Sequence, residues 1–357
     1  MKRLIICNTY SQLILAFQLK LTLFANDEVD LWISDNSTNS EEVFLRVKST
    51  KLFNKIKFLE LKSFFYGRSV LKSLEDIWTY NFGAIKNAEK YDEIIFYNFT
   101  LSIYALSDYY YKIGHNCQWS RFEEGIFSYN TDFPKSIRLK VTGLFRLFIK
   151  RPDVLNLVTR FYCVYPWLKN THLNWELVKI PDFFETKNKL LFYLNYVFDY
   201  HSNIKMPKYI YFASSSDVDN KPFGETSTVI KLANFLGKEN FIVKMHPRDN
   251  RTIYQDLGIN VLDKSFIPWE IIQLNMDITK HCLLTVNSGA FITISAMLKS
   301  QVSGYFLYNM LVSTSQSFIS RKYEIHEMLS KLHAKGICLT INDNLDSIYG
   351  LCMKQQL

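Results

Sequence analysis

The chain has 357 residues, and because a single hydrophobic core rarely grows beyond about 300 residues, this length favours two domains. Its 48% hydrophobic and 21% charged residues exclude a disordered or fibrous protein, and its 28 Phe and 22 Tyr against 12 Gly and 8 Pro disfavour a turn-rich β-sandwich. The net charge of +8 indicates anionic partners such as nucleotides, acidic sugars or phospholipid surfaces, without choosing among them.

Short apolar runs recur along the chain and are separated by longer mixed segments, which is typical of βαβ units. The stretch between about residues 110 and 208 is irregular and aromatic by comparison. One intervening helix is predicted at 13–24 from the helical spacing of its apolar residues. The predicted strands cover 4–7, 29–33, 56–61, 93–97, 209–213, 241–245, 282–286, 304–307 and 337–341.

This rhythm predicts an α/β protein of the GT-B type, with two Rossmann-like lobes whose parallel sheets face a central cleft. Pro152, Pro166 and Pro181 punctuate the irregular stretch, and we expect the domains to cover 1–180 and 181–357. Ligands of such folds bind at the carboxyl ends of the strands, so the residues that follow each strand are the first candidates for a site.

We expect a cytoplasmic protein. Polar residues at 8, 9, 11 and 12 interrupt the apolar N-terminal stretch before it reaches the length of a signal peptide. The six cysteines form neither C-x-x-C pairs nor metal-binding patterns with histidine, so we interpret them as reduced core residues. The uncharged stretches 281–298 and 300–320 contain too many polar residues to be read as transmembrane helices.

Several nucleotide-binding and catalytic motifs are absent. No two glycines are separated by a single residue, which excludes the G-x-G-x-x-G dinucleotide fingerprint, and there is no P-loop, H-E-x-x-H or G-x-S-x-G sequence. Asp217 and Asp219 form a D-x-D pattern that could hold a divalent cation, but so short a match more often marks a solvated loop, so no metal site is predicted.

An acidic pair in the first half is a candidate for general acid–base chemistry. Glu123 and Glu124 lie between aromatic residues and Gly125, which permits a sharp turn. Burial and mutual repulsion should raise the pKa of one carboxyl, while Arg121 could keep the other ionised. The alternative is a turn with two solvated acids.

A histidine follows a predicted strand in the second half. His246 comes directly after 241–245, where it could donate a proton or carry charge beside a phosphate. Lys244 and Arg248 would raise the local positive potential, and Pro247 would fix the direction in which the chain leaves the strand. The alternative is an ordinary surface histidine.

Three further segments could bind a substrate. Asn287 and Ser288 link an apolar strand to a helix-like stretch, where backbone N–H groups and a hydroxyl can hold an anion, although an ordinary helix cap would look the same. Glu270 lies in the first turn of another helix, where it either binds a ribose or simply complements the helix dipole. Ser214 and Ser215 follow the predicted strand 209–213 and are additional substrate-binding candidates.

Together and in this order, these motifs resemble the bacterial sialyltransferases of glycosyltransferase family 52, which have the GT-B fold and extend lipooligosaccharide and capsule glycans. The resemblance implies an acceptor-binding first lobe with a general base at Glu123 or Glu124, the family's usage leaning toward the first. It also implies a second lobe in which His246 and Pro247 contact the phosphate of a CMP-sugar and Glu270 binds the cytidine ribose. Asn287 and Ser288 would hold the phosphate. The segment 7–13 is similar to the family's opening strand and loop and makes Thr9 and Gln12 candidates in the cleft.

The implied reaction is an inverting, metal-independent transfer of sialic acid from CMP-sialic acid to a hydroxyl of a galactose-terminated surface glycan. The base would deprotonate the acceptor hydroxyl, while His246, Ser288 and backbone N–H groups would stabilise the departing CMP phosphate. No cofactor is expected. The expected partners are the CMP-sugar donor and an oligosaccharide or glycolipid acceptor, and the sequence is compatible with a homo-oligomer but gives no basic stripe for nucleic acid.

A basic amphipathic segment could contact the inner face of the membrane. Its alternative is a helix packed on the core with solvated cations. The apolar face comprises Ile137, Val141, Leu144, Phe145 and Phe148, and the flanking cations are Arg138, Lys140, Arg146, Lys150 and Arg151.

Other functions remain compatible with the sequence. A transferase for another CMP-activated acidic sugar, such as Kdo, would use the same motifs. A nucleotide-sugar epimerase has a similar two-lobed architecture and needs no acceptor, and a non-catalytic scaffold of a polysaccharide assembly complex would leave the motifs without a chemical role.

Overall fold

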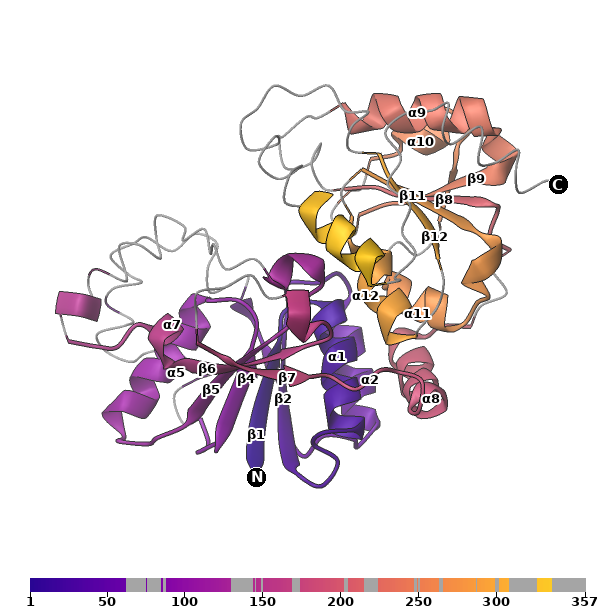
Figure 1. The fold of residues 1–357 in the computed structure, drawn as a ribbon. Coiled ribbons are helices and arrows are strands. Elements are labelled where there is room, and N and C mark those ends of the chain that lie inside the picture. The colour runs from indigo at the N-terminus through magenta and orange to yellow at the C-terminus, as the bar shows by residue number, and fades with distance from the viewer. Residues whose placement is uncertain are drawn as a thin grey trace. The chain divides into compact units, whose positions relative to one another are not determined.

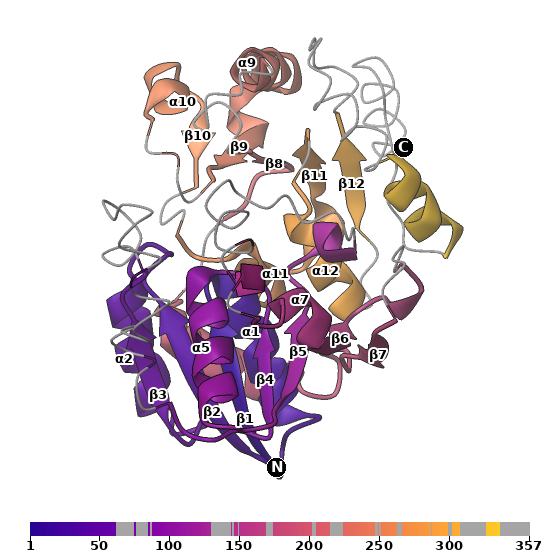
Figure 2. The same cartoon turned by 90° about the vertical axis from the view of Figure 1, so that its left-hand side faces the viewer.

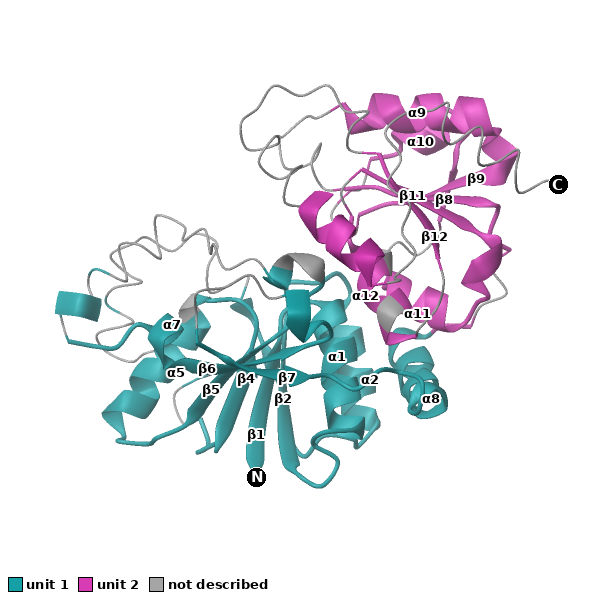
Figure 3. Cartoon of the chain, in the orientation of Figure 1, with its two compact units in different colours: residues 1–199 teal, residues 200–357 magenta. Residues whose placement is uncertain are grey.

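The computed structural model contains two compact units, residues 1–199 (unit 1) and 200–357 (unit 2), which are coloured separately in Figure 3. The expected division at 180/181 lies inside unit 1, before its last helix. The structure describes residues 1–61, 75, 85, 88–129, 144, 146–148, 150–168, 174–201, 205–214, 224–246, 249, 251–262, 266–286, 288–298, 302–307 and 326–335.

Unit 1 contains a parallel seven-stranded sheet in the order β3-β2-β1-β4-β5-β6-β7. Central strands such as β1 and β4 are buried almost throughout, as expected for parallel strands covered on both faces. The strands are β1 (Lys2–Cys7), β2 (Glu28–Ser34), β3 (Ile56–Leu59), β4 (Glu93–Phe96), β5 (Gln118–Phe122), β6 (Val158–Cys163) and β7 (Glu176–Lys179).

Helices cover both faces of this sheet. Figures 1 and 2 show α1 and α2 on one face and α5 on the other, and α8 packs against α1 and α2. Thr9 caps α1 by accepting a hydrogen bond from the backbone N–H of Gln12, which fixes the turn between β1 and α1. The helices are α1 (Tyr10–Leu21), α2 (Ser40–Ser49), α5 (Leu101–Lys112), α7 (Val154–Leu157) and α8 (Lys187–Phe198), with 3₁₀ turns at Ile126–Tyr129 and Pro166–Leu168.

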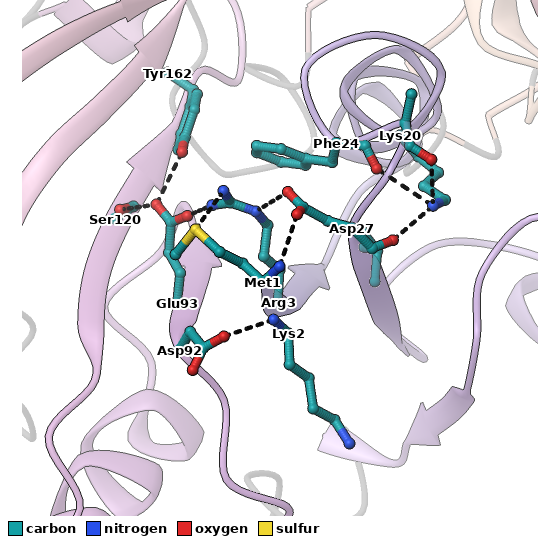
Figure 4. A network of polar contacts seen from close by, with 12 residues as sticks. Met1, Lys2, Arg3, Lys20, Phe24, Asp27, Asp92, Glu93, Ser120 and Tyr162 are labelled. Carbon is teal, nitrogen blue, oxygen red and sulfur yellow. Dashed lines mark hydrogen bonds and ion pairs between the residues drawn. The ribbon is translucent and has the colours of Figure 1, made fainter.

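A buried polar network joins strands near the amino end of β1 (Figure 4). Arg3 pairs with Glu93 and donates from Nε to Asp27 at 2.7 Å, and Glu93 also accepts hydrogen bonds from Ser120 at 2.5 Å and Tyr162 at 2.9 Å. Because every buried charge in this network has a partner, β5 and β6 can bury polar side chains in the sheet.

Unit 2 contains a parallel five-stranded sheet in the order β10-β9-β8-β11-β12. Figure 1 shows α9 and α10 on one face and α11 and α12 on the other. The strands are β8 (Tyr209–Phe212), β9 (Phe241–Lys244), β10 (Asn260–Val261), β11 (Cys282–Thr285) and β12 (Ser303–Phe306). The helices are α9 (Glu225–Leu236), α10 (Ile253–Asp256), α11 (Trp269–Leu274) and α12 (Ala290–Met297), with 3₁₀ turns at Lys238–Asn240 and Ile278–Lys280.

The predicted α/β fold with two Rossmann-like parallel units is confirmed. One expectation was wrong: the aromatic stretch after residue 110 is not irregular, because it supplies β5, β6 and β7 of the first sheet. The predicted strand 337–341 lies outside the described residues.

Candidate functional site

The topology of unit 1 places a candidate site at the carboxyl ends of its strands. From β1 the sheet extends in one direction through β2 and β3 and in the other through β4 to β7, so the order of connection reverses between β1 and β4. Ligands of open α/β sheets bind beside such a reversal, outside the carboxyl ends of the strands. The residues that follow β1, β4 and β5 therefore define the candidate site of unit 1.

Three residues expected from the sequence meet at this edge. Glu124, two residues beyond the end of β5, accepts hydrogen bonds at Oε1 from the hydroxyl of Thr9 and from Nε2 of Gln12, the latter at 2.7 Å. Gln12 is itself held, because its Oε1 accepts a hydrogen bond from the backbone N–H of Asn8 at 2.7 Å. The turn between β1 and α1 thus fixes one carboxyl oxygen of Glu124.

The ionisation of Glu124 is suited to proton exchange near neutral pH. Burial raises its pKa to about 7, although the hydrogen bonds from Thr9 and Gln12 and the charge of Arg121 oppose the increase. Oε1 already accepts two hydrogen bonds, and Oε2 has no hydrogen-bond partner among the described residues. Since Oε1 accepts two hydrogen bonds, the neutral form of this carboxyl would carry its proton on Oε2.

Arg121 supplies the positive charge beside this carboxyl from inside the unit. Its Nε donates to the carbonyl oxygen of Tyr97, which follows β4, at 3.0 Å. The guanidinium lies 4.9 Å from the ring centroid of Tyr97 and 5.6 Å from that of Trp175. Aromatic packing of this kind fixes the charge in place.

Glu123 has different surroundings from its neighbour. It is fully buried, and its Oε2 accepts hydrogen bonds from the hydroxyl of Tyr129 and from the backbone N–H of Val164, the latter at 2.7 Å. These contacts join β5 to the segment after β6, so Glu123 has a structural role. Of the two acids, Glu124 is the less buried and the one that the turn between β1 and α1 holds.

Gly125 turns the chain away from the acidic pair. Its φ of 82° lies in the left-handed region, which glycine adopts without strain. The backbone N–H of Glu124 donates to the hydroxyl of Ser128 at 2.7 Å across this turn. The turn thereby fixes the backbone of Glu124, while Thr9 and Gln12 fix its side chain.

Unit 2 has a second candidate site at the corresponding edge of its own sheet. Here the order of connection reverses between β8 and β11. Ser214, beyond the end of β8, is anchored by the buried carboxylate of Glu225, which accepts hydrogen bonds from its backbone N–H at 2.9 Å and from its hydroxyl. Tyr211 donates to the same carboxylate at 3.0 Å. Nothing in the sequence around Glu225 indicated this anchoring role.

A buried amine ends β9 in unit 2. Lys244 is only 7% exposed, and burial lowers its pKa to about 8, against the opposing influence of the negative charge of Glu270 in α11. An anion bound beside this amine would stabilise its charged form, because a nearby negative charge raises the pKa of a lysine. The structure thus relates two residues that the sequence analysis had assigned to substrate binding.

His246 lies two residues beyond Lys244, partly buried. Its carbonyl oxygen accepts a hydrogen bond from the backbone N–H of Asp249 at 2.8 Å. Although burial opposes it, hydrogen bonds from Arg251 and the charge of His246 lower the pKa of Asp249. This edge of unit 2 therefore combines a histidine, a buried amine and a paired carboxylate.

The start of α12 completes the edge. Thr285, the last residue of β11, donates from its hydroxyl to the carbonyl oxygen of Phe212 at 3.0 Å and accepts from the backbone N–H of Ser288 at 2.9 Å. The hydroxyl of Ser288 accepts from the backbone N–H of Ala290 at 3.4 Å. Ser288 thus caps the helix, whose N-terminus is favourable for negative charge.

Four predicted site residues and the D-x-D pair lie outside the described residues: Pro247, Arg248, Ser215, Asn287, Asp217 and Asp219.

The described residues contain neither a cluster suited to a metal ion nor a helix suited to span a membrane. Within those ranges, no group of three or more His, Cys, Asp or Glu side chains is arranged to hold a metal ion. Across the same part of the chain, no helix combines the length and the apolar character that crossing a bilayer requires.

The sequence matches no protein-family model and no curated protein. Its structure is similar to that of UDP-GlcNAc 2-epimerase from Methanocaldococcus jannaschii, with a TM-score of 0.52 at 12% identity over 96% of this chain and 89% of that chain. It is also similar to a UDP-N-acetylglucosamine 2-epimerase, with a TM-score of 0.51 at 12% identity over 99% of this chain and 86% of that chain. A third similar structure is S. aureus MnaA with UDP, with a TM-score of 0.50 at 13% identity over 86% of this chain and 78% of that chain.

These comparisons correct the functional expectation from the sequence. The similar structures are UDP-GlcNAc 2-epimerases rather than CMP-sialic acid sialyltransferases, so the resemblance to family 52 was wrong, and with it the glycosyltransferase activity, the CMP-sialic acid donor and the place in lipooligosaccharide or capsule synthesis. At such low identities the likeness to solved structures shows the two-unit GT-B-like fold.

Proposed function

We propose that this chain is a nucleotide-sugar epimerase in which Glu124 exchanges a proton with the sugar. The observation that carries the proposal is the state of this carboxyl, whose pKa is raised to about 7 and whose Oε1 is held by Thr9 and Gln12. A general acid or base is most effective when its pKa lies near the working pH. A group of this kind can take up and release a proton without a large energetic penalty in either direction.

Epimerisation makes a specific chemical demand. When the inverted carbon lies next to the anomeric carbon, its hydrogen leaves as a proton, the C–H electron pair forms a double bond to the anomeric carbon, and the bond from that carbon to the nucleotide phosphate breaks. Return of a proton to the opposite face and of the nucleotide to the anomeric carbon completes the inversion, so that no atoms are gained or lost. In the proposal, Oε2 of Glu124 performs one of these transfers, and Thr9 and Gln12 hold the carboxyl in the orientation that the transfer needs. The charge of Arg121 helps the deprotonated form to exist in a buried position.

The edge of unit 2 is proposed to bind phosphate groups. Lys244 and His246 supply positive charge there, and the capped start of α12 supplies a favourable dipole. Because these groups can neutralise phosphate charge themselves, we expect the reaction to proceed in the presence of EDTA. The fold likeness to UDP-GlcNAc 2-epimerases, and to MnaA solved with UDP, supports a uridine nucleotide sugar as the first substrate to test.

The experiment is an incubation of the full chain with a panel of UDP-N-acetylhexosamines and UDP-hexoses, in EDTA and without an acceptor, followed by proton NMR of the sugar. We expect one sugar to be converted to its epimer. Glu124→Gln should lower the rate by about a hundredfold or more, as is usual on loss of a general acid or base.

Glu41→Gln is the matched control, because it makes the same change at an exposed position in α2. The control should keep the wild-type rate. Binding of the panel without any conversion would overturn the epimerase assignment, and an unchanged rate for Glu124→Gln would overturn the role of this residue.

A further inference from the structure

Unit 1 carries a small apolar surface formed by Leu144, Leu147 and Phe148, here called the apolar ridge. Its residues have helical backbone, and their spacing of three and four positions puts them on one face. The three side chains are 69%, 68% and 83% exposed. Large apolar side chains that gather on a surface in this way mark interaction sites, whereas isolated ones need no explanation.

The polarity of this segment is inverted relative to a surface helix of a water-soluble domain. Arg146, in the same turn, is the buried residue: its guanidinium pairs with Asp108 of α5 at 2.5 Å and donates to the carbonyl oxygen of Pro152 at 2.6 Å. Arg146, expected from the sequence to be one of the cations flanking the membrane-facing segment, is instead buried. The buried ion pair anchors the segment to α5 and leaves the apolar ridge facing outward.

Cations lie beside the apolar ridge in the described part of unit 1. Lys150 is exposed just beyond it. Tyr111, at the end of α5, is 57% exposed, and the guanidinium of Arg151 lies 5.7 Å from its ring centroid. Lys112, the last residue of α5, is also exposed.

Two acids, Asp108 and Asp153, lie near these cations. Asp108 is fully buried between Arg146 and Arg151, at 2.5 and 3.4 Å. Asp153 accepts hydrogen bonds from the backbone N–H of Leu155 at 3.1 Å and from the hydroxyl of Tyr104 at 3.3 Å. Among the described residues of this region, the four cations Lys112, Arg146, Lys150 and Arg151 outnumber these two acids, so the charge beside the apolar ridge is positive.

We propose that the apolar ridge inserts into the surface of an anionic lipid bilayer. The arrangement matches what such a surface offers, because leucine and phenylalanine enter the boundary between headgroups and acyl chains, tyrosine is favoured at that level, and lysine and arginine meet the anionic headgroups. A protein partner would also bury the apolar ridge, but the cations among the described residues beside it favour a negatively charged surface. The inference does not depend on the proposed enzymatic activity.

The test is sedimentation of the full chain with vesicles of phosphatidylcholine alone or of phosphatidylcholine mixed with phosphatidylglycerol. We expect binding to the anionic vesicles only, with loss at high salt. Phe148→Ser should weaken binding by about tenfold or more, since the buried area of a phenylalanine is lost. Lys150→Asn should weaken it by about fivefold, the usual effect of one cation near an anionic surface.

Each variant has a matched control in unit 1. Phe192→Ser removes a phenylalanine of α8 that is 72% exposed. Lys51→Asn removes an exposed lysine whose φ of 55° matches the 54° of Lys150, a conformation that asparagine tolerates. Both controls should bind like the wild type, with unchanged circular dichroism for all four variants.

Three results would overturn the proposal. The first is the absence of sedimentation with anionic vesicles. The second is equal binding by Phe148→Ser and Phe192→Ser, which would show that the apolar ridge is not the contact. The third is a wild-type dimer in solution together with a monomeric Phe148→Ser variant. That result would assign the apolar ridge to contact with a second copy of the chain instead.

Discussion

Replacing Glu124 by glutamine should change the pH dependence of stability in a way that follows from its raised pKa. In the folded protein the pKa of Glu124 is about 7, against an ordinary value of 4.5. Between these values the folded state keeps a proton that the unfolded chain has released, so this carboxyl lowers stability progressively as the pH rises from about 4.5 to about 7. Above that window the destabilisation is complete.

The size of this stability change follows from the folded and the ordinary pKa of Glu124. A difference of this size corresponds to about 3 kcal/mol in the free energy of unfolding at about pH 8 and to almost nothing below about pH 4. Glutamine cannot ionise, and its carbonyl oxygen can still accept the hydrogen bonds that Thr9 and Gln12 donate. Glu124→Gln should therefore be more stable than the wild type by about 2–3 kcal/mol at about pH 8 and nearly equal to it in acid.

Urea denaturation followed by tryptophan fluorescence measures this difference. Five of the six tryptophans lie in unit 1, so the signal reports mainly on the unit that contains Glu124. Glu41→Gln, at an exposed site, should show no such pH dependence. A stability difference between Glu124→Gln and the wild type that is the same in acid and in base would refute the reasoning, because the carboxyl would then ionise normally.

Three further substitutions test other parts of the structure. Lys244→Met should raise the free energy of unfolding by up to about 3 kcal/mol below about pH 8, because the buried amine of the wild type must carry charge there, and this gain should disappear toward about pH 10.5. The same variant should bind UDP more weakly in calorimetry, and an affinity equal to that of the wild type would contradict the phosphate-binding role of Lys244. Glu123→Ala should lower stability by about 2–4 kcal/mol in urea denaturation, because buried donors lose their acceptor, and a change below about 0.5 kcal/mol would contradict its structural role. Asp108→Ala should cost about 3–5 kcal/mol by leaving the charge of Arg146 buried and unpaired, whereas a neutral result would mean that this arginine reaches water.

The sequence was informative where strands are apolar throughout. The runs that became β1, β2, β4, β8 and β11 are buried on both faces, so hydrophobicity alone indicates them. It failed for β5 and β6, which carry Ser120, Arg121 and Arg160. Their burial depends on partners that are distant in sequence, such as Glu93 from β4, and no local pattern shows that pairing.

The candidate site was likewise predictable from the sequence only in part. The topology of parallel sheets predicts that polar residues gather after β1 and β5. Thr9, Gln12 and Glu124 do meet there. The difference between Glu123 and Glu124 could not be read locally, because it depends on Tyr129 and on the backbone of Val164. The family resemblance failed for a related reason, since short polar motifs after strands are a property of Rossmann-like units in general.

The most direct measurement of the central claim is the isotopic composition of the product when the reaction is run in deuterium oxide. If Glu124 exchanges a proton with the sugar, the epimer should carry deuterium at the inverted carbon, and Glu124→Gln should form this labelled epimer about a hundredfold more slowly or not at all. An epimer that keeps its original hydrogen, or one that Glu124→Gln forms at the wild-type rate, would contradict the account.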